Sequence, residues 1–540
     1  MTQLWFNNYP SNVAHEIKQH SYNSLLDLFQ ESVEKYQDET AFSNLGSELS
    51  FNDVERLSRD FAAYLQTELK IKKGDRIALM CPNTLCFPIA MWGIIKVGGV
   101  QVNINPMYTA RELRHQLNDA DLDTIIIFSS ATKVLAQAIA DTSIKNIITI
   151  DLDDLVNKAL PANDIDERLV VTTTFTQALT LGRELALKDI TLSADDLLFL
   201  QYTGGTTGVS KGAMLTHGNI MANVLQYQEF GKNYIEYGKE VVITAIPMYH
   251  IFALTVNALC YFFFGAKNIL VNNPRDMDTF VNIWQDNKVT FFTGVNTLFN
   301  GLLHTPGFSD ADFSALKLSI GGGAAVQQAV ANKWRTVTGN RLQEGYGLSE
   351  TSPILTLNFA VDDHYVAGIG TPVPSTELSI RDDMDNILAQ GQAGELCAKG
   401  PQVMKGYWRN LEATKQTMTE DGFFKTGDIA MLDEQGFFHI VDRKKDMIIV
   451  SGFNVYPNEI EAEMANMPGI LESACIGIKA EKTGEAVKIF AVKKDFKITE
   501  QDVINFCRNN LTAYKVPKSV VFISEIPKSS VGKILRRELK

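Results

Sequence analysis

Residues 200–212, LQYTGGTTGVSKG, carry the side chains best suited to bind a phosphate. The glycines allow positive φ and let backbone N–H groups approach an anion closely. The hydroxyls can donate to phosphate oxygens or reach a metal ion, and Lys211 adds a mobile positive charge. An apolar run at 196–201 precedes them and predicts a buried strand. A strand that leads into such a loop is typical of an anion-binding nest, so we expect a phosphate site here.

The spacing of this stretch excludes two familiar phosphate motifs. A Walker loop ends in Gly-Lys-Ser/Thr, whereas Lys211 here follows Ser210 and precedes Gly212. The GxGxxG spacing of a dinucleotide fingerprint is also missing. A flexible surface turn is the remaining alternative, but a plain turn does not need three threonines and a lysine.

A second chemical stretch is EGYGLSETSP at residues 344–353. Tyr346 stands between Gly345 and Gly347, which predicts an exposed ring suited to stack on a base. Glu350 lies beside hydroxyl residues and is a hard oxygen ligand suited to Mg²⁺. A surface loop would explain neither the glycine-flanked tyrosine nor the acid.

Two further stretches follow predicted strands and are less specific. His250, in PMYHIFAL, lies where α/β enzymes place their ligands, and the apolar run after it, through Leu254, would line a hydrophobic pocket. A lone histidine is more often structural. The small residues of IGGGAAV, at 320–326, would let a flat ring lie against the backbone, but a tight strand–helix turn explains them equally well.

Two polar groups lie nearer the C-terminal end. Asp428 ends the run DGFFKTGD, and a carboxylate there can accept from both hydroxyls of a ribose, although an aspartate in a β-turn is the simpler alternative. Lys533 follows Gly532 in PKSSVGKILRR. A turn at that glycine would let the lysine reach into a site, whereas a basic tail is the alternative.

Composition limits the class of protein. A chain of 540 residues with 45% hydrophobic content predicts two or more domains. A net charge of −13 argues against a nucleic-acid-binding protein and suits a soluble one. The six cysteines are scattered without CxxC pairs, which indicates free thiols in a reducing compartment. We expect no secretory signal and no membrane span; the longest apolar run, 251–266, contains Asn257 and predicts a buried helix.

The chain alternates strand and helix patterns, which is the signature of a parallel α/β sheet. Predicted strands lie within 40–42, 74–80, 98–106, 123–128, 196–201, 241–246, 268–271, 290–295 and 316–321, with helices at 88–97 and 110–120. Short alternating runs from about 368 to 440 predict a twisted antiparallel unit. The charge run at 442–446 is typical of a solvated charged turn and fits a linker equally well, and about a hundred residues follow it. We therefore expect an N-terminal domain at 1–442 and a small α+β domain at 443–540.

Seven motifs occur together in one order: YTGGTTGVSKG, PMYHIFAL, GGGAAV, YGLSETSP, DGFFKTGDIA, DRKKDMIIVSGFNVYPNEIE and PKSSVGKILRREL. In the residues of these motifs, and in their order and spacing, the chain resembles the adenylate-forming superfamily of acyl-CoA synthetases, peptide-synthetase adenylation domains and luciferases. The resemblance covers about residue 200 to the C-terminus. Among members, the chain is most similar to the bacterial long-chain fatty-acid–CoA ligases.

The resemblance implies two half-reactions. A carboxylate attacks the α-phosphate of ATP to give acyl-AMP and pyrophosphate, and the thiol of CoA then displaces AMP. By the same resemblance Lys533 matches the lysine that serves the α-phosphate. The remaining matches are the β/γ-phosphate cradle at Thr203, Gly204, Gly205, Thr206, Thr207, Gly208 and Lys211; the Mg²⁺ positions Thr203 and Glu350; the adenine site at Gly322, Gly323, Ala324, Gly345, Tyr346 and Gly347; and the ribose contacts Asp428 and Arg443.

The resemblance also implies a moving C-terminal domain. Lys445 matches the hinge, and after rotation Ser451 and Gly452 would line the pantetheine channel of CoA. His250 matches the wall beside the substrate carboxylate. Leu254 stands where some long-chain members carry a tryptophan gate, which leaves chain-length selection open. We expect a cytoplasmic enzyme that binds a long-chain fatty acid, ATP and CoA, with peripheral membrane association and a homodimer both open.

Three other functions compete with this one. An adenylation enzyme could pass an amino acid or another acid to a carrier protein, but residues 251–254 offer no aspartate for a substrate ammonium. A luciferase-like oxygenase is disfavoured by the motif residues that resemble those of the long-chain fatty-acid–CoA ligases. A non-catalytic nucleotide-binding protein is disfavoured by the presence of Lys211, Glu350 and Lys533. Measurement of pyrophosphate exchange with fatty acids and with amino acids would separate the acyl-CoA ligase from the adenylation enzyme.

Overall fold

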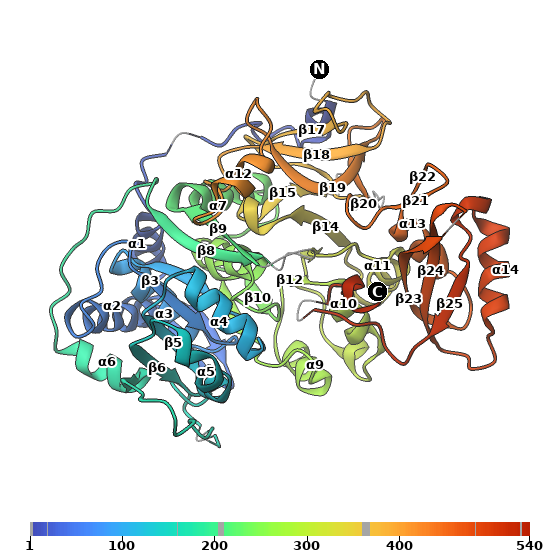
Figure 1. The fold of residues 1–540 in the computed structure, drawn as a ribbon. Helices are drawn as coiled ribbons and strands as arrows, with labels where there is room; N and C mark the ends of the chain where they lie inside the picture. The colour runs from blue at the N-terminus through green and yellow to red at the C-terminus, as the bar shows by residue number, and fades with distance from the viewer. Residues whose placement is uncertain are drawn as a thin grey trace.

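The structure, a computed structural model, describes residues 4–18, 20–158, 160–161, 163–203, 210–358, 368–480, 482–529 and 532–540. The described strands form four sheets. The first α/β sheet lies at the left of Figure 1 and the C-terminal sheet at the right, and the four-stranded sheet lies above the middle of the molecule. Two of these sheets are α/β sheets of the expected kind and two are mainly antiparallel. The predicted fold class is therefore confirmed.

The first α/β sheet has seven strands, and all its pairs except β8–β9 are parallel. In spatial order they are β7 (Thr173–Thr174), β6 (Asn146–Ile150), β5 (Thr124–Phe128), β3 (Arg76–Met80), β4 (Val100–Asn103), β8 (Leu197–Thr203) and β9 (Lys211–Thr216). Successive residues of β3 enter different cores, because side chains alternate across a strand. Ile77 and Leu79 join the large core shared with both α/β sheets, whereas Ala78 and Met80 join the smaller core on the other face.

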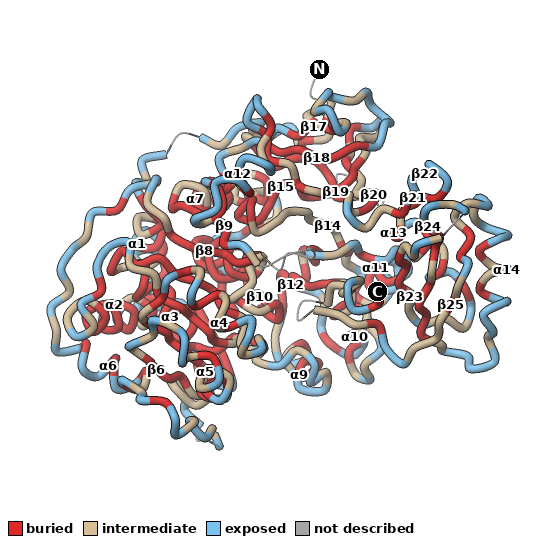
Figure 2. Tube along the Cα trace, viewed as in Figure 1, coloured by how far each residue is buried: buried red, intermediate tan, exposed pale blue. Residues whose placement is uncertain are grey.

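The second α/β sheet has nine strands. In spatial order they are β16 (Thr371–Pro372), β15 (Ile354–Leu357), β14 (Leu342–Gly347), β13 (Leu318–Gly321), β12 (Phe291–Gly294), β10 (Val241–Thr244), β11 (Lys267–Leu270), β1 (Thr40–Asn44) and β2 (Ser47–Ser50). The strands from β14 to β1 run parallel, and the outer pairs are antiparallel. Buried residues follow the strands of both sheets (Figure 2).

Helices cover both α/β sheets and meet between them. They are α1 (Leu25–Tyr36), α2 (Phe51–Thr67), α3 (Cys86–Lys96), α4 (Ala110–Asp119), α5 (Thr132–Ala138), α6 (Phe175–Arg183), α7 (His217–Gly231), α8 (Tyr261–Phe263), α9 (Met277–Asp286), α10 (Asn296–His304) and α11 (Gln328–Thr338). The rings of Phe29, Trp92 and Phe262, from α1, α3 and α8, pack together with centroids 4.3 to 5.7 Å apart. This aromatic cluster joins the two sheets into one core.

The C-terminal third contains the two other sheets. The predicted antiparallel unit consists of β17 (Glu377–Arg381), β18 (Gly394–Lys399), β19 (Phe424–Leu432) and β20 (Phe438–Arg443), with α12 (Leu411–Gln416) beside it. The last sheet contains β21 (Ile448–Val450), β22 (Phe453–Val455), β23 (Ile470–Ala480), β24 (Gly484–Lys493) and β25 (Ser519–Phe522). It packs with α13 (Pro457–Met464) and α14 (Glu500–Asn510) around a core of its own.

The predicted strands and helices are confirmed, with two differences. The prediction missed β9, so the hydroxyl-rich loop joins an antiparallel hairpin rather than leading directly toward a helix. The expected buried helix at 251–266 is present, but its main part is a π-helix at Ala253–Cys260. The six cysteines are buried and free, as predicted. Within the described residues, the structure contains no helix that is both long and apolar enough to cross a membrane.

Candidate active site

The hairpin of β8 and β9 places the two ends of the phosphate loop side by side. Thr203 and Lys211 are cross-strand partners, so their side chains leave the same face of the hairpin. The predicted ligands Gly204, Gly205, Thr206, Thr207 and Gly208 lie outside the described residues.

Glu350 lies against this hairpin. It belongs to a short 3₁₀ turn, Ser349–Thr351, which contacts both β8 and β9. Its side chain is buried, and Tyr407 Oη donates a hydrogen bond to its Oε1 at 2.8 Å. The Lys211 Nζ lies 5.2 Å from the centroid of the Tyr407 ring. Tyr407 therefore joins the phosphate-loop lysine to the predicted metal ligand.

The environment of Glu350 sets its charge. Burial raises the pKa of the Glu350 carboxyl, whereas the hydrogen bond from Tyr407 acts in the opposite direction. Because a phenol donates without adding positive charge, it supports the ionised carboxylate and leaves its charge uncancelled. The carboxylate is thus prepared to meet a cation.

Tyr407 was missed by the sequence analysis. It is held by the edge of β9: the Met214 N–H donates to the Gly406 carbonyl at 2.9 Å, and the Trp408 N–H donates to the Gly212 carbonyl at 2.8 Å. The available signal was a tyrosine that follows a glycine, as Tyr346 does. Its pairing with Glu350 spans 57 residues, which no local pattern reveals.

Tyr346, Asp428 and Arg443 come together from three strands. Tyr346 Oη donates to Asp428 Oδ2 at 2.6 Å, and Arg443 Nε lies 3.7 Å from Asp428 Oδ1. Asp428 and Arg443 are partners in the register of β19 and β20. Burial raises the pKa of Asp428, while Arg443 and the phenol oppose this shift. The prediction of an exposed Tyr346 ring is wrong: the ring is half-buried, because its hydroxyl is bound to the carboxylate.

The glycines of the predicted adenine site adjoin one another and the His250 segment. A Cβ at Gly322 would lie 2.9 Å from Phe252 Cε1 and 3.4 Å from the Gly345 carbonyl oxygen. Gly323 has φ +76°. A side chain at Gly347 would overlap the Pro353 carbonyl. These glycines therefore allow a close approach of three chain segments, as expected where a flat ring meets backbone.

His250 is a neutral residue at the start of the helix that follows β10. Burial lowers the pKa of His250 to about 4. Its Nδ1 accepts from the Phe252 N–H at 3.3 Å, so the neutral ring carries its proton on Nε2. Leu254 is fully buried within the π-helix.

The tail that carries Lys533 reaches this side of the nine-stranded sheet. Its turn is closed by hydrogen bonds from the Ser529 N–H to the Lys533 carbonyl and from the Lys533 N–H to Ser529 Oγ, at 2.8 and 3.1 Å. A Cβ at Gly532 would lie 2.5 Å from Thr297 Oγ1 and 3.4 Å from Val295 Cγ2. Val295 also lies 3.8 Å from a Cβ built on Gly323. The turn before Lys533 thus lies next to the predicted adenine segment.

The predicted hinge residue lies beside the Asp428 and Arg443 cluster, whereas the predicted CoA residues lie on a separate hairpin. Lys445 lies between β20 and β21, and burial followed by repulsion from Arg443 lowers its pKa to about 8. Ser451 and Gly452 form the exposed turn of the β21–β22 hairpin, with φ of 52° and 84°. Among the described residues, no hydrogen bond or ion pair joins these two to the rest of the candidate site.

The comparisons with known proteins agree with this arrangement. Residues 29–408 match the family model described as AMP-binding enzyme, and residues 459–533 match the AMP-binding enzyme C-terminal domain. The chain belongs to the AMP-binding enzyme family. ATP and CoA fit as substrates of an enzyme of this family.

Relatives in this family match the chain over its whole length. It is 49% identical to a long-chain-fatty-acid–CoA ligase of Escherichia coli O6:H1, across 100% of this chain and 98% of the relative. The solved structure of ATP-bound MatB from Rhodopseudomonas palustris has a TM-score of 0.83 at 29% identity, with 96% and 98% coverage. The apo structure of the same enzyme has a TM-score of 0.73 at 29% identity and the same coverage.

Proposed function

We propose that this AMP-binding enzyme is a long-chain fatty-acid–CoA ligase that forms acyl-AMP from ATP and then transfers the acyl group to CoA. Support for the substrate comes from the full-length relative of that name at 49% identity. Support for the mechanism comes above all from the contact of the Gly532 turn with Thr297, since it brings the neighbouring Lys533 toward the nucleotide site.

In the first half-reaction two anions must meet. The substrate carboxylate attacks the α-phosphorus, and pyrophosphate leaves with the electron pair of the broken P–O bond. Positive charge must therefore converge on the phosphates. We assign Lys533 to the α-phosphate and the hairpin from Thr203 to Lys211 to the leaving pyrophosphate.

The nucleoside would be held by the other cluster. We assign Asp428 and Arg443 to the ribose and Tyr346 to the adenine, with residues 322–324 against the ring. The Asp428 carboxylate suits ribose hydroxyls because its present partner at 2.6 Å is itself a hydroxyl, from Tyr346.

Glu350, with Thr203, fits an Mg²⁺ ion. Mg²⁺ is usually bound by one or two carboxylates together with substrate phosphates rather than by an all-protein cage. A single buried carboxylate with a phenol donor beside the phosphate hairpin meets that description. When bound, the ion would neutralise charge on the phosphate oxygens; Glu350 would orient it, and Tyr407 would keep the carboxylate ionised.

A small apolar pocket lies under the site. Its cavity volume is about 10 Å³, which is room for about one water molecule, and it lies between α7 and the strands β12 to β15. Its lining residues are Tyr227, Gly231, Tyr234, Ile235, Phe291, Leu318, Ile320, Gln343, Leu357 and Asn358. Two of them, Ile320 and Leu357, lie within 3.6 Å of a Cβ built on Gly345. The pocket is therefore next to the nucleotide cluster, and an acyl chain could enter it only after the surrounding side chains move apart.

The second half-reaction requires another arrangement of the last domain. We propose that residues 443–540 rotate about Lys445, which withdraws Lys533 and brings Ser451 and Gly452 to the site. In the part of the chain that the structure describes, neither residue forms a hydrogen bond or an ion pair with the site. The higher TM-score to the ATP-bound than to the apo form of MatB supports an arrangement suited to adenylation.

The test is product formation by the purified protein. With ATP, Mg²⁺ and palmitate it should release pyrophosphate, and with CoA added it should form palmitoyl-CoA and AMP. Pyrophosphate exchange with amino acids but not with fatty acids would contradict the proposal. Peripheral membrane association, a homodimer and a cytoplasmic location stay predictions.

A further inference from the structure

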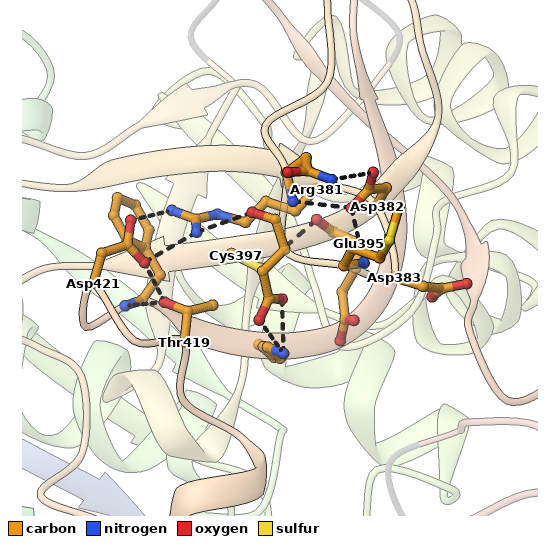
Figure 3. A network of polar contacts seen from close by, with 12 residues as sticks. Arg381, Asp382, Asp383, Glu395, Cys397, Thr419 and Asp421 are labelled. Carbon is orange, nitrogen blue, oxygen red and sulfur yellow. Dashed lines mark hydrogen bonds and ion pairs between the residues drawn. The ribbon is translucent and has the colours of Figure 1, made fainter.

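Glu395 is a buried acid that none of the proposed catalytic roles uses. It lies on β18, is 9% exposed, and belongs to the polar network shown in Figure 3. Its Oε1 accepts from the Gly427 N–H at 3.1 Å, and its Oε2 accepts from Lys444 Nζ at 2.8 Å. One carboxylate thus holds two separate segments, one with each oxygen.

Both segments lead directly to proposed functional residues. Gly427 precedes Asp428 and has φ +74°, so it forms the turn that presents the ribose carboxylate. Lys444 precedes the hinge residue Lys445. The Lys444 N–H also donates to the Gly427 carbonyl at 3.0 Å. Glu395, Gly427 and Lys444 therefore form a closed ring of three hydrogen bonds.

A second acid, Asp383, also binds Lys444, the residue before the proposed hinge. Lys444 Nζ also contacts Asp383 Oδ1 at 2.8 Å, but that aspartate is 87% exposed, whereas the Glu395 side chain is 11% exposed. Screening by water weakens the outer ion pair, so the inner one dominates. The ring fixes Lys444 to the antiparallel sheet, one residue before the proposed hinge at Lys445.

We infer that Glu395 is a positioning residue that sets both the ribose-facing turn and the stationary end of the hinge. The inference rests on the proposed two-step ligase function. Without the ring, the turn at Gly427 and the starting angle of the last domain would lose their common support. The adenylation step would suffer more than thiolation, because it needs Asp428 in place and Lys533 delivered together.

Three variants separate this role from a merely structural one. Glu395→Ala removes the hydrogen bonds to Gly427 and to Lys444. It should raise the KM for ATP and slow adenylation, each about tenfold, because hydrogen bonds to a charged group are lost. Lys444→Met removes only the contact between Glu395 and Lys444, so it should slow adenylation while leaving the KM for ATP nearly unchanged. The double variant should be no worse than Glu395→Ala, since both act through one ring.

The matched control is Lys425→Met. Lys425 lies on β19 like Gly427 and pairs with Asp385 at 2.7 Å, but neither residue belongs to the ring. It should leave the KM for ATP and the ratio of the two half-reaction rates as in the wild type.

The assay measures the half-reactions separately, as pyrophosphate release from ATP with palmitate and as palmitoyl-CoA formation from supplied palmitoyl-AMP. If the wild type performs neither, the proposed function fails. If the wild type performs both and Glu395→Ala keeps the wild-type KM and rate ratio, or if Lys425→Met matches Glu395→Ala, this inference alone is overturned.

Discussion

Gly532→Ala should slow adenylation selectively. The added Cβ would lie 2.5 Å from Thr297 Oγ1, closer than real Cβ atoms approach, so the turn before Lys533 would have to withdraw from the nine-stranded sheet. This clash exists only while the tail is docked. In the proposed rotated arrangement of the last domain, Thr297 would no longer lie beside the turn, so thiolation would meet no obstacle.

Two costs must be kept apart to estimate the effect. Gly532 has φ +75°, and alanine in that region costs about 1–2 kcal/mol, but the turn keeps this strain in both arrangements, so it lowers overall stability without changing the ratio of rates. Overpacking at a close contact costs about 1–3 kcal/mol and applies only to the docked arrangement. Adenylation should therefore slow about 5- to 150-fold relative to thiolation.

Thr297→Ala provides the decisive second variant. Without the Thr297 hydroxyl, the nearest atom to the new Cβ is Val295 Cγ2 at 3.4 Å, a tolerable contact. The double variant should recover most of the adenylation rate, measured as single-turnover pyrophosphate release. Equal slowing of both half-reactions, or no recovery in the double variant, would refute the docked position of the tail.

Two further outcomes are expected. Lys533→Ala should abolish acyl-AMP formation but leave thiolation of supplied acyl-AMP largely intact; equal loss of both would contradict the two-arrangement mechanism. Tyr407→Phe should raise the pKa of Glu350 further, because the phenol opposes the shift caused by burial. The ionised carboxylate is then lost at a higher pH, so the acidic limb of kcat/KM for ATP should move upward; an unmoved limb would separate Glu350 from that step.

The fold could be predicted where the pattern is local and repeated. The continuous apolar run at 77–80 and the glycine turn before residue 100 identify buried parallel strands without knowledge of their neighbours. The strand β9 was missed because KGAMLT has no strong alternation and is stabilised by its pairing with β8 and with the segment around Tyr407. Such pairing is a tertiary effect that the six residues do not encode alone.

The sequence predicted which residues make up the candidate site, but it could not predict how these residues contact one another. Motif wording identified Glu350 and Asp428 as acids of interest. It could not show that each accepts from a tyrosine, because the partners are 57 and 82 residues away in the chain. Glu395 carried no signal either, since an acid in a strand is ordinarily a solvated residue; only its burial and its two partners reveal it.

The pairing of acids with phenols resolves an electrostatic difficulty. The protein has a net charge of −13, yet its site must attract ATP, a carboxylate and CoA, all anionic. If Lys211 formed an ion pair with Glu350, the hairpin would lose the positive charge that the leaving pyrophosphate needs. Tyr407 prevents this by satisfying the carboxylate with a neutral donor and offering the lysine a ring face instead. Among the described residues, no ion pair joins Lys211 to an acid, so in the proposed mechanism the lysine charge would be available to phosphate and the Glu350 charge to Mg²⁺. Replacement of Tyr407 by leucine would remove both the hydrogen bond to Glu350 and the ring face that Lys211 contacts. A charged residue at this position could not provide both contacts without forming an ion pair with one of the two residues.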